Sequence, residues 1–82
     1  RTSAPTLTLY PDPASDRITL HIRGMDGPLR AELYDLLGRR KFARRYDHGG
    51  TQELDVSALP RGVYLLRLTH RGGTMLRRIV LE

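Results

Sequence analysis

The chain has 82 residues, a formal net charge of +5 and no cysteine. A domain of this size buries only roughly 60% of its unfolded surface, which leaves little room for a deep catalytic cleft. Without cysteine there is no disulfide framework and no thiolate metal site, and no apolar run reaches the roughly 18 residues of a membrane span. Thirteen of the fourteen basic residues are arginine, and the positive charge favours anionic partners.

Short apolar runs separated by turn signals follow one another along the chain, a pattern typical of an all-β sandwich. Residues 1–5 have the composition of a linker from an upstream domain, and residues 6–82 are expected to form the folded domain. We predict seven strands and no helix. The strands are Thr6–Tyr10, Arg17–Arg23, Leu29–Asp35, Arg40–Tyr46, Thr51–Val56, Gly62–Thr69 and Thr74–Leu81.

Alternation of apolar and polar residues assigns the faces of these strands. Gly62–Thr69 is apolar on both faces and is therefore predicted to be a central strand, whereas Arg40–Tyr46 alternates weakly, with Phe42 as its best core candidate. Gly49 and Gly50 are predicted to close a hairpin into Thr51–Val56. The side chains expected to face the core are Ile18, Leu20, Ile22, Leu29, Ala31, Leu33, Leu54 and Val56. On Gly62–Thr69, one apolar face carries Tyr64, Leu66 and Leu68 and the other carries Val63 and Leu65.

A first signature follows the first strand, in the order Tyr-Pro-Asp-Pro-Ala-Ser-Asp over residues 10–16. Pro11 and Pro13 fix two backbone φ angles and cannot donate to a sheet, so they end the strand. Asp12 and Ser15 can bind nearby backbone amides in turns. The segment is predicted to be a stiff corner between two strands, and a direct contact with a partner is the alternative.

Two further signatures join a strand end to a turn. Residues 33–39 read Leu-Tyr-Asp-Leu-Leu-Gly-Arg, where Gly38 accommodates a positive φ and Asp35 can cap the turn. Residues 54–65 read Leu-Asp-Val-Ser-Ala-Leu-Pro-Arg-Gly-Val-Tyr-Leu, where Asp55 or Ser57 can cap a single helical turn. This spacing is typical of a tyrosine corner, so Tyr64 is predicted to be buried with its hydroxyl bonded to upstream backbone.

In this order and spacing the three signatures resemble the C-terminal sorting domain of type IX secretion system cargo, the type A sorting domain of the Por secretion system. The resemblance covers about residues 7–81 and implies a seven-stranded, antiparallel, Ig-like β-sandwich. It also implies a non-catalytic signal that directs an attached exported protein through the translocon. That protein would cross the periplasm and end at the cell surface, attached or released into the medium.

The resemblance also implies site residues and partners. The sorting-motif positions are Pro11, Asp12, Pro13, Ala14, Gly38, Leu59, Gly62 and Tyr64. The terminal residues Arg77, Arg78, Ile79 and Val80 are the candidate contacts to the translocon or to an anionic surface. The implied partners are the type IX translocon, a cell-surface sortase, anionic lipopolysaccharide and the upstream cargo domain of the same chain. Asp12 stands where asparagine is commoner in the family, but it keeps the acceptor that the turn needs.

Enzymatic and cofactor readings find little support. Paired carboxylates in a turn, such as Asp12 and Asp16, usually bind backbone, and we expect neither catalysis nor a cofactor. His21, His48 and His70 lie far apart in the sequence and are expected to be solvated rather than to bind a metal.

Two interpretations are open for the basic clusters, which are Arg39-Arg40-Lys41, Arg44-Arg45 and Arg77-Arg78. If Arg40–Tyr46 and Thr74–Leu81 are edge strands, their arginines block edge-to-edge aggregation; alternatively, they bind an anionic partner. Nucleic acid is not expected, because aromatic side chains are few. The alternative function is an Ig-like or fibronectin-like module that binds carbohydrate or a surface for a secreted enzyme. Such a module would carry a row of exposed aromatic side chains.

Overall fold

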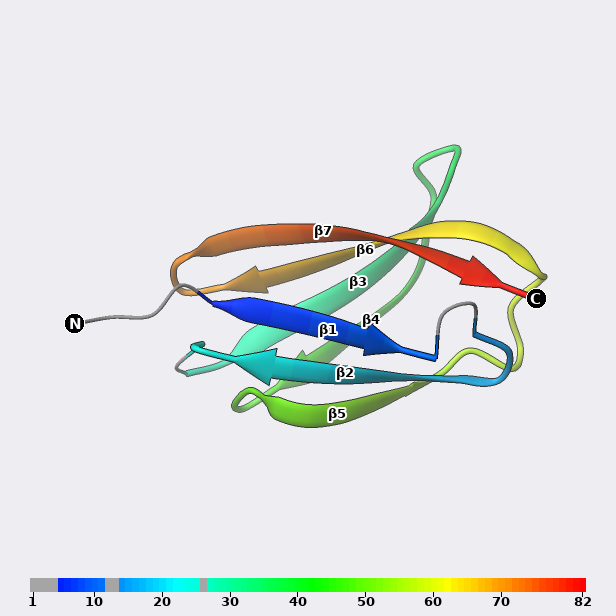
Figure 1. The fold of residues 1–82 in the computed structure, drawn as a ribbon. Helices are drawn as coiled ribbons and strands as arrows, with labels where there is room; N and C mark the ends of the chain where they lie inside the picture. The colour runs from blue at the N-terminus through cyan, green and yellow to red at the C-terminus, as the bar shows by residue number, and fades with distance from the viewer. Residues whose placement is uncertain (1–4, 12–13, 26) are drawn as a thin grey trace.

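The computed structural model describes residues 5–11, 14–25 and 27–82. They form seven antiparallel strands in two sheets, which face each other in a sandwich (Figure 1). The strands are β1 (Thr6–Tyr10), β2 (Arg17–Arg23), β3 (Leu29–Asp35), β4 (Arg40–Tyr46), β5 (Gly50–Asp55), β6 (Gly62–His70) and β7 (Gly73–Leu81). The predicted strands are confirmed, with boundaries that agree to within one residue. In the described part of the chain, no helix is long and apolar enough to cross a membrane.

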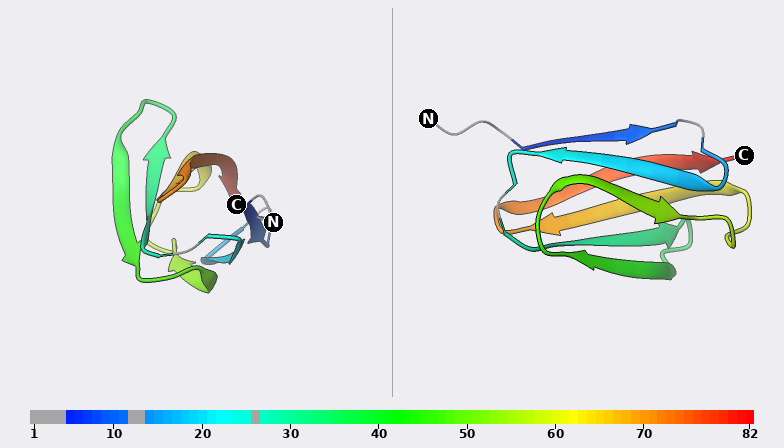
Figure 2. Two further views of the ribbon diagram at one scale, coloured as in Figure 1. Left: turned by 90° about the vertical axis from the view of Figure 1, so that its left-hand side faces the viewer. Right: turned by 90° about the horizontal axis from the view of Figure 1, so that it is seen from below.

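One sheet has the order β1-β2-β5 and the other the order β4-β3-β6-β7. The prediction that β6 is central is confirmed, since it pairs with β3 on one side and β7 on the other. The arginine-rich strands β4 and β7 are the edges of the larger sheet, as their charge indicates. The two layers are seen end-on in the left view of Figure 2.

The core lies between the two sheets and is lined by the alternate residues of each strand. All side chains that were expected to face the core are buried, and Leu7, Ala14, Met25, Ile79 and Leu81 join them. On β6 the face of Tyr64, Leu66 and Leu68 is buried, whereas on the other face Val63 is half-buried and Leu65 is exposed. Phe42, on the edge strand β4, is half-buried and packs against this core. Met25 lies in a segment that we predicted only as a turn.

The prediction of a hairpin at Gly49 and Gly50 is wrong. β4 pairs with β3 in one sheet and β5 pairs with β2 in the other, so the chain crosses between the sheets at this point. Glycines allow a tight change of direction, but they do not determine whether the next strand pairs with the previous one or crosses to the opposite layer.

Three connections lie at one end of the sandwich, which we call the signature end. They are the β1–β2, β3–β4 and β5–β6 connections, and the C-terminal residue lies with them (Figure 2, right). The register of the strands places them there: Asp35 is opposite Tyr64, Arg17 is opposite Asp55 and Leu81 is opposite Gly62. The three sequence signatures are therefore neighbours in space, although they span most of the chain.

Candidate functional site

The first signature is attached to the end of β7. The amide of Ala14 donates to the carbonyl oxygen of Val80 at 2.9 Å, and the amide of Glu82 donates to the carbonyl oxygen of Ala14 at 2.8 Å. Ala14 and Leu81 thus form a parallel bridge between the two layers, and both side chains are buried. A larger side chain than that of Ala14 would separate the first signature from β7.

Of the two prolines of this signature, the structure describes Pro11. Pro11 is exposed, follows a cis peptide bond and lines a small cavity together with Arg78 and Ile79. Asp12 and Pro13 lie outside the described residues. The structure therefore brings Pro11 and Ala14 next to the terminal strand that the family resemblance singled out.

Arg61 joins the third signature to the first. Its Nη1 donates to the carbonyl oxygen of Ser15, and its Nη2 donates to the carbonyl oxygen of Val56 at 3.0 Å. The amide of Val56 also donates to the carbonyl oxygen of Asp16 at 2.8 Å. This role of Arg61 could not be predicted from a local pattern, because its partner Ser15 lies 46 residues away. The side chain holds two signatures in a fixed relative position.

The turn of the third signature has the expected caps. Asp55 Oδ1 accepts from the amide of Ser57 at 3.0 Å and from its hydroxyl at 2.6 Å, and these bonds lower the pKa of Asp55. Tyr64 is buried, and its hydroxyl donates to the carbonyl oxygen of Pro60, as predicted for a tyrosine corner. Leu59 packs half-buried against the core. The hydrogen bonds of this turn therefore position the start of β6.

The second signature is a tight β3–β4 turn organised by one carboxylate. Asp35 Oδ1 accepts from the amides of Leu37 and Arg39, both at 2.9 Å, and Oδ2 accepts from Arg39 Nε at 2.8 Å. The amide of Arg39 contributes most to lowering the pKa of Asp35. Gly38 has φ +83°, a conformation that an L side chain adopts only with strain. These contacts hold Leu36 and Leu37 out into solvent at the tip of the turn.

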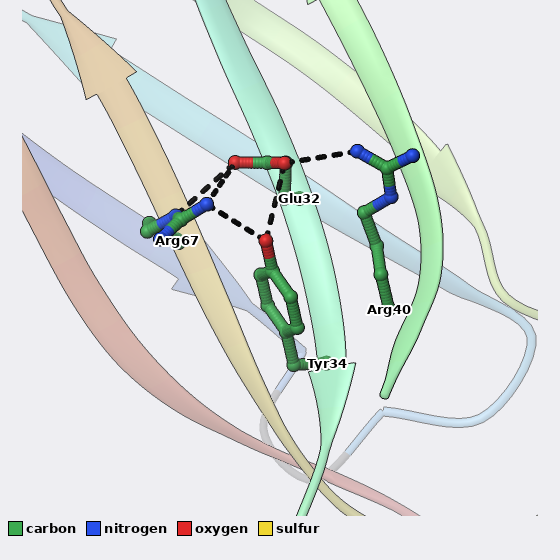
Figure 3. Close-up of polar contacts among 4 residues, drawn as sticks. All are labelled: Glu32, Tyr34, Arg40 and Arg67. Carbon is green, nitrogen blue, oxygen red and sulfur yellow. Dashed lines mark hydrogen bonds and ion pairs between the residues drawn. The ribbon is translucent and has the colours of Figure 1, made fainter. Parts of the chain in front are cut away.

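A buried carboxylate lies on the outer face of the larger sheet (Figure 3). Glu32 is 4% exposed. Its Oε1 accepts from Arg67 Nη2 at 2.8 Å and from Nε at 3.1 Å, and its Oε2 accepts from the Tyr34 hydroxyl at 3.1 Å and from Arg40 Nη1 at 3.2 Å. The hydrogen bond from Arg67 lowers the pKa of Glu32 most, and burial opposes it. The cluster joins β3, β4 and β6.

Arg67 also covers the aromatic ring of Tyr34. Its guanidinium carbon lies 5.1 Å from the ring centroid, and its Nη2 donates to the Tyr34 hydroxyl at 2.7 Å. Arg67 and Tyr34 line one side of a surface groove of about 240 Å³ that adjoins the second signature. The other side chains of this groove include Leu36, Leu65 and Leu76, which are 67%, 39% and 59% exposed. We call it the leucine groove.

Apolar side chains at such exposure, gathered beside an arginine, are typical of protein-binding surfaces. The sequence alone did not identify the leucine groove. Leu36 and Leu37 in a turn were the available signal, whereas Leu65 and Leu76 meet them only through strand pairing.

The terminal strand presents its residues alternately. Ile79 is buried, Val80 and Arg77 are half-buried, and Arg78 is exposed on the outer face opposite Leu65. Arg78 is thus the candidate in this strand that a partner can reach most directly. Arg77 donates from Nη1 to the carbonyl oxygen of Leu76 at 2.9 Å.

The histidines do not come together. His21 Nδ1 is 3.2 Å from Thr51 Oγ1, His48 Nδ1 is 2.7 Å from the carbonyl oxygen of Gly49, and His70 lies at the end of β6. Among the described residues there is no group of three or more metal-ligating side chains. The chemistry available at the signature end is recognition through an exposed turn, an apolar groove and exposed arginines.

Comparisons with known proteins agree with this geometry. A family model described as a secretion system C-terminal sorting domain matches residues 8–82. Among solved structures, dimeric latent PorU from Porphyromonas gingivalis is similar, with 21% sequence identity and a TM-score of 0.72. The match covers 94% of this chain but 9% of that chain, and at this identity it shows the shared Ig-like sandwich. No curated protein matches.

Proposed function

Because this chain belongs to the family of secretion system C-terminal sorting domains, we propose that it directs an attached protein through the type IX translocon and across the outer membrane. The family is a sorting signal and not a catalytic domain, and it implies export to the cell surface or the extracellular space. The cargo attached to it would pass through the periplasm in a folded state. Residues 1–5 would link the cargo to the domain at 6–82.

One observation carries the proposal: the three signatures and the end of β7 meet at one end of the sandwich. There the motif residues divide into two groups. Ala14 and Tyr64 are buried and hold the turns in place, whereas Gly38, Pro11 and Arg78 are exposed. We propose that the buried group shapes the surface and that the translocon contacts the exposed group together with the leucine groove.

Two further partners belong to the same proposal. A cell-surface sortase would remove the domain and join the cargo to anionic lipopolysaccharide. The exposed arginines of β4 and β7 supply the positive charge that attracts such a surface over distances of about a Debye length. Ile79 is buried and Val80 is half-buried, so these two residues would support the contact. The exposed Arg78 would make it.

The alternative of a carbohydrate-binding module gains nothing from the aromatic side chains. Phe42 and Tyr46 pack against the core, and Tyr34 lies beneath Arg67. Tyr10, at 46% exposed, stands on the other sheet. The described aromatic residues therefore form no row on one sheet face.

The test is a fusion of an export signal peptide, a fluorescent protein and residues 1–82, expressed in a type IX-competent host and in a translocon-deficient strain. Fluorescence at the surface or in the medium of the competent host alone supports sorting, and the mass of the exported product reports removal of the domain. Retention of a stable fusion in the periplasm of both strains would contradict the proposal.

Two variants locate the contact surface. Leu36→Ser with Leu37→Ser, and separately Arg78→Glu, should reduce export without loss of folding, because these side chains are exposed at the signature end. Arg23→Glu is the matched control, since Arg23 is equally an exposed strand arginine but lies at the opposite end. If the two signature-end variants are exported as well as the Arg23→Glu control, the signature end is not the contact surface.

A further inference from the structure

A second concave site lies at the end of the sandwich opposite the signatures. It has a volume of about 240 Å³ and is lined by Pro28, Leu29, Arg30, Arg45, Thr69 and His70. We call it the basic pocket. Its residues come from the start of β3, the end of β4 and the end of β6. These lie together at the end of the sandwich where β1 begins (Figure 1). None of them belongs to a sequence signature.

The strand register brings the donors of the basic pocket side by side. Arg30 is directly opposite Arg45 on β4 and directly opposite Thr69 on β6. Directly opposite side chains have Cβ atoms roughly 4.5–5.5 Å apart, and like charges in this arrangement destabilise a sheet. The fold therefore places two arginines directly opposite each other at a cost in stability.

No carboxylate in the described residues neutralises this pair. The ion pairs of these residues involve Arg17, Arg39, Arg40 and Arg67, and neither Arg30 nor Arg45 takes part in one. Glu32 is the nearest acid along β3, and it is already bonded to Arg67, Arg40 and Tyr34. Arg40 and Arg67 thus surround the carboxylate of Glu32. Arg30 and Arg45, by contrast, have no carboxylate partner among the described residues.

His70 adds a fourth donor. Its Nδ1 accepts the amide hydrogen of Gly72 at 3.1 Å, so the neutral ring carries its own hydrogen on Nε2. The pocket thus combines two guanidinium forks, the hydroxyl of Thr69 and an imidazole N–H, with an apolar wall formed by Pro28 and Leu29.

We propose that the basic pocket binds a phosphate group. Arginine forks match the oxygens of phosphate in a bidentate manner, and hydroxyl and imidazole donors serve the remaining oxygens. The volume is below the roughly 300–1,000 Å³ of sites for drug-sized ligands, so it suits one anionic group with little attached to it. No aromatic side chain lines the pocket to stack a base, which argues against nucleic acid. The site is separate from the signature end and does not depend on the sorting role.

The test is a titration of the ¹⁵N-labelled chain at low ionic strength with inorganic phosphate, followed by two-dimensional NMR. Sodium chloride at matched ionic strength is the control. We expect saturable shifts at residues 28–30, 45 and 69–70. Glucose 6-phosphate and glucose form the second arm: tighter binding of glucose 6-phosphate than of phosphate identifies a sugar-borne group, equal binding identifies the phosphate alone, and glucose should not bind.

Variants decide between a site and general attraction. Arg30→Gln and Arg45→Gln should each weaken phosphate binding by about tenfold, since each removes a charge-assisted fork. Arg17→Gln removes an exposed arginine from the other sheet, at the opposite end of the sandwich, and should leave the affinity unchanged. Arg30→Lys keeps the charge but removes the bidentate guanidinium fork. For each variant, a dispersed two-dimensional NMR spectrum verifies that the chain is folded. Equal weakening by Arg17→Gln, or shifts spread over arginines at both ends, would overturn the proposal.

Discussion

The amide of Ala14 donates to the carbonyl oxygen of Val80, 66 positions later in the sequence, at 2.9 Å. This bond, together with that from Glu82 back to Ala14, fastens the β1–β2 connection to the last residues of β7. The signature end is therefore a single unit in which the first signature, the third signature and the terminal strand support one another.

Leu81→Ala should destabilise the domain by about 2–4 kcal/mol, because Leu81 is 2% exposed and its removal leaves a cavity beside Ala14. Leu76→Ala is the matched control on the same strand, and its 59% exposure predicts a change within about 0.5 kcal/mol. Urea denaturation followed by far-UV circular dichroism measures both. Similar losses in the two variants would contradict the contribution of the buried Leu81 side chain to stability.

Glu32→Gln should cost about 1–3 kcal/mol at pH 7, since the buried carboxylate accepts bonds from two arginines and a tyrosine. The pKa of Glu32 is lowered from its usual 4.5. The unfolded chain therefore binds this proton more readily, and the stabilisation is complete above about pH 4.5 and lost as the pH falls through the lower pKa of the folded state.

The difference in unfolding free energy between wild type and Glu32→Gln should consequently shrink on acidification, measured in urea from pH 7 to pH 2. Glu53→Gln is the control, because Glu53 is exposed and lies 3.6 Å from Arg17. An exposed pair of this kind contributes little, so that variant should remain within about 0.5 kcal/mol of wild type. A difference for Glu32→Gln that does not change with pH would argue against an ionised Glu32.

Tyr64→Phe should destabilise the domain by about 1 kcal/mol, because it removes the bond from the hydroxyl to the Pro60 carbonyl oxygen and leaves that oxygen without its partner. The loss should appear as a lower midpoint of urea denaturation with an unchanged slope. A midpoint equal to that of wild type would show that the tyrosine corner does not stabilise the start of β6.

Tyr46→Phe should have the opposite sign. The Tyr46 hydroxyl oxygen is buried, and among the described residues it has no hydrogen-bond partner; burial also raises the pKa of Tyr46. Removing an unsatisfied buried group should stabilise the fold by about 1 kcal/mol. Thermal unfolding of this variant beside Tyr64→Phe makes the comparison, and a lower midpoint than that of wild type would contradict it.

Gly38→Ala should cost roughly 1–2 kcal/mol, although nothing lies within 4 Å of the position that a Cβ would occupy. The cost is conformational, because φ is +83°. Gly38→Asn should cost less, since asparagine adopts this conformation more readily. Urea denaturation of the two variants distinguishes this strain from a steric clash, which would instead penalise the larger asparagine more.

The strands could be predicted because their information is local. In β2 the alternation of Ile18, Leu20 and Ile22 defines both the strand and its buried face, and prolines and glycines mark where strands end. The tyrosine corner was predictable for the same reason, since Tyr64 and Pro60 are four residues apart. The order of the signatures added the family and, with it, the Ig-like topology.

The rest depends on which strands become neighbours. Glu32 is a charged residue on the polar face of a strand, a pattern that predicts exposure; it is buried because Arg67 and Arg40 arrive from two other strands. Arg61 in the β5–β6 connection donates to the carbonyl oxygen of Ser15 in the β1–β2 connection. Leu65 comes near Leu36 only because β3 pairs with β6. A single sequence does not contain these pairings in local form.

The position of β7 has a consequence for synthesis. β7 supplies the partner of β6 and the anchor of Ala14, and it is translated after the other six strands of this domain. A nascent or truncated chain that stops before Gly73 leaves the edge of β6 unpaired and the β1–β2 connection unanchored. The signature end is therefore complete only after β7 has been translated.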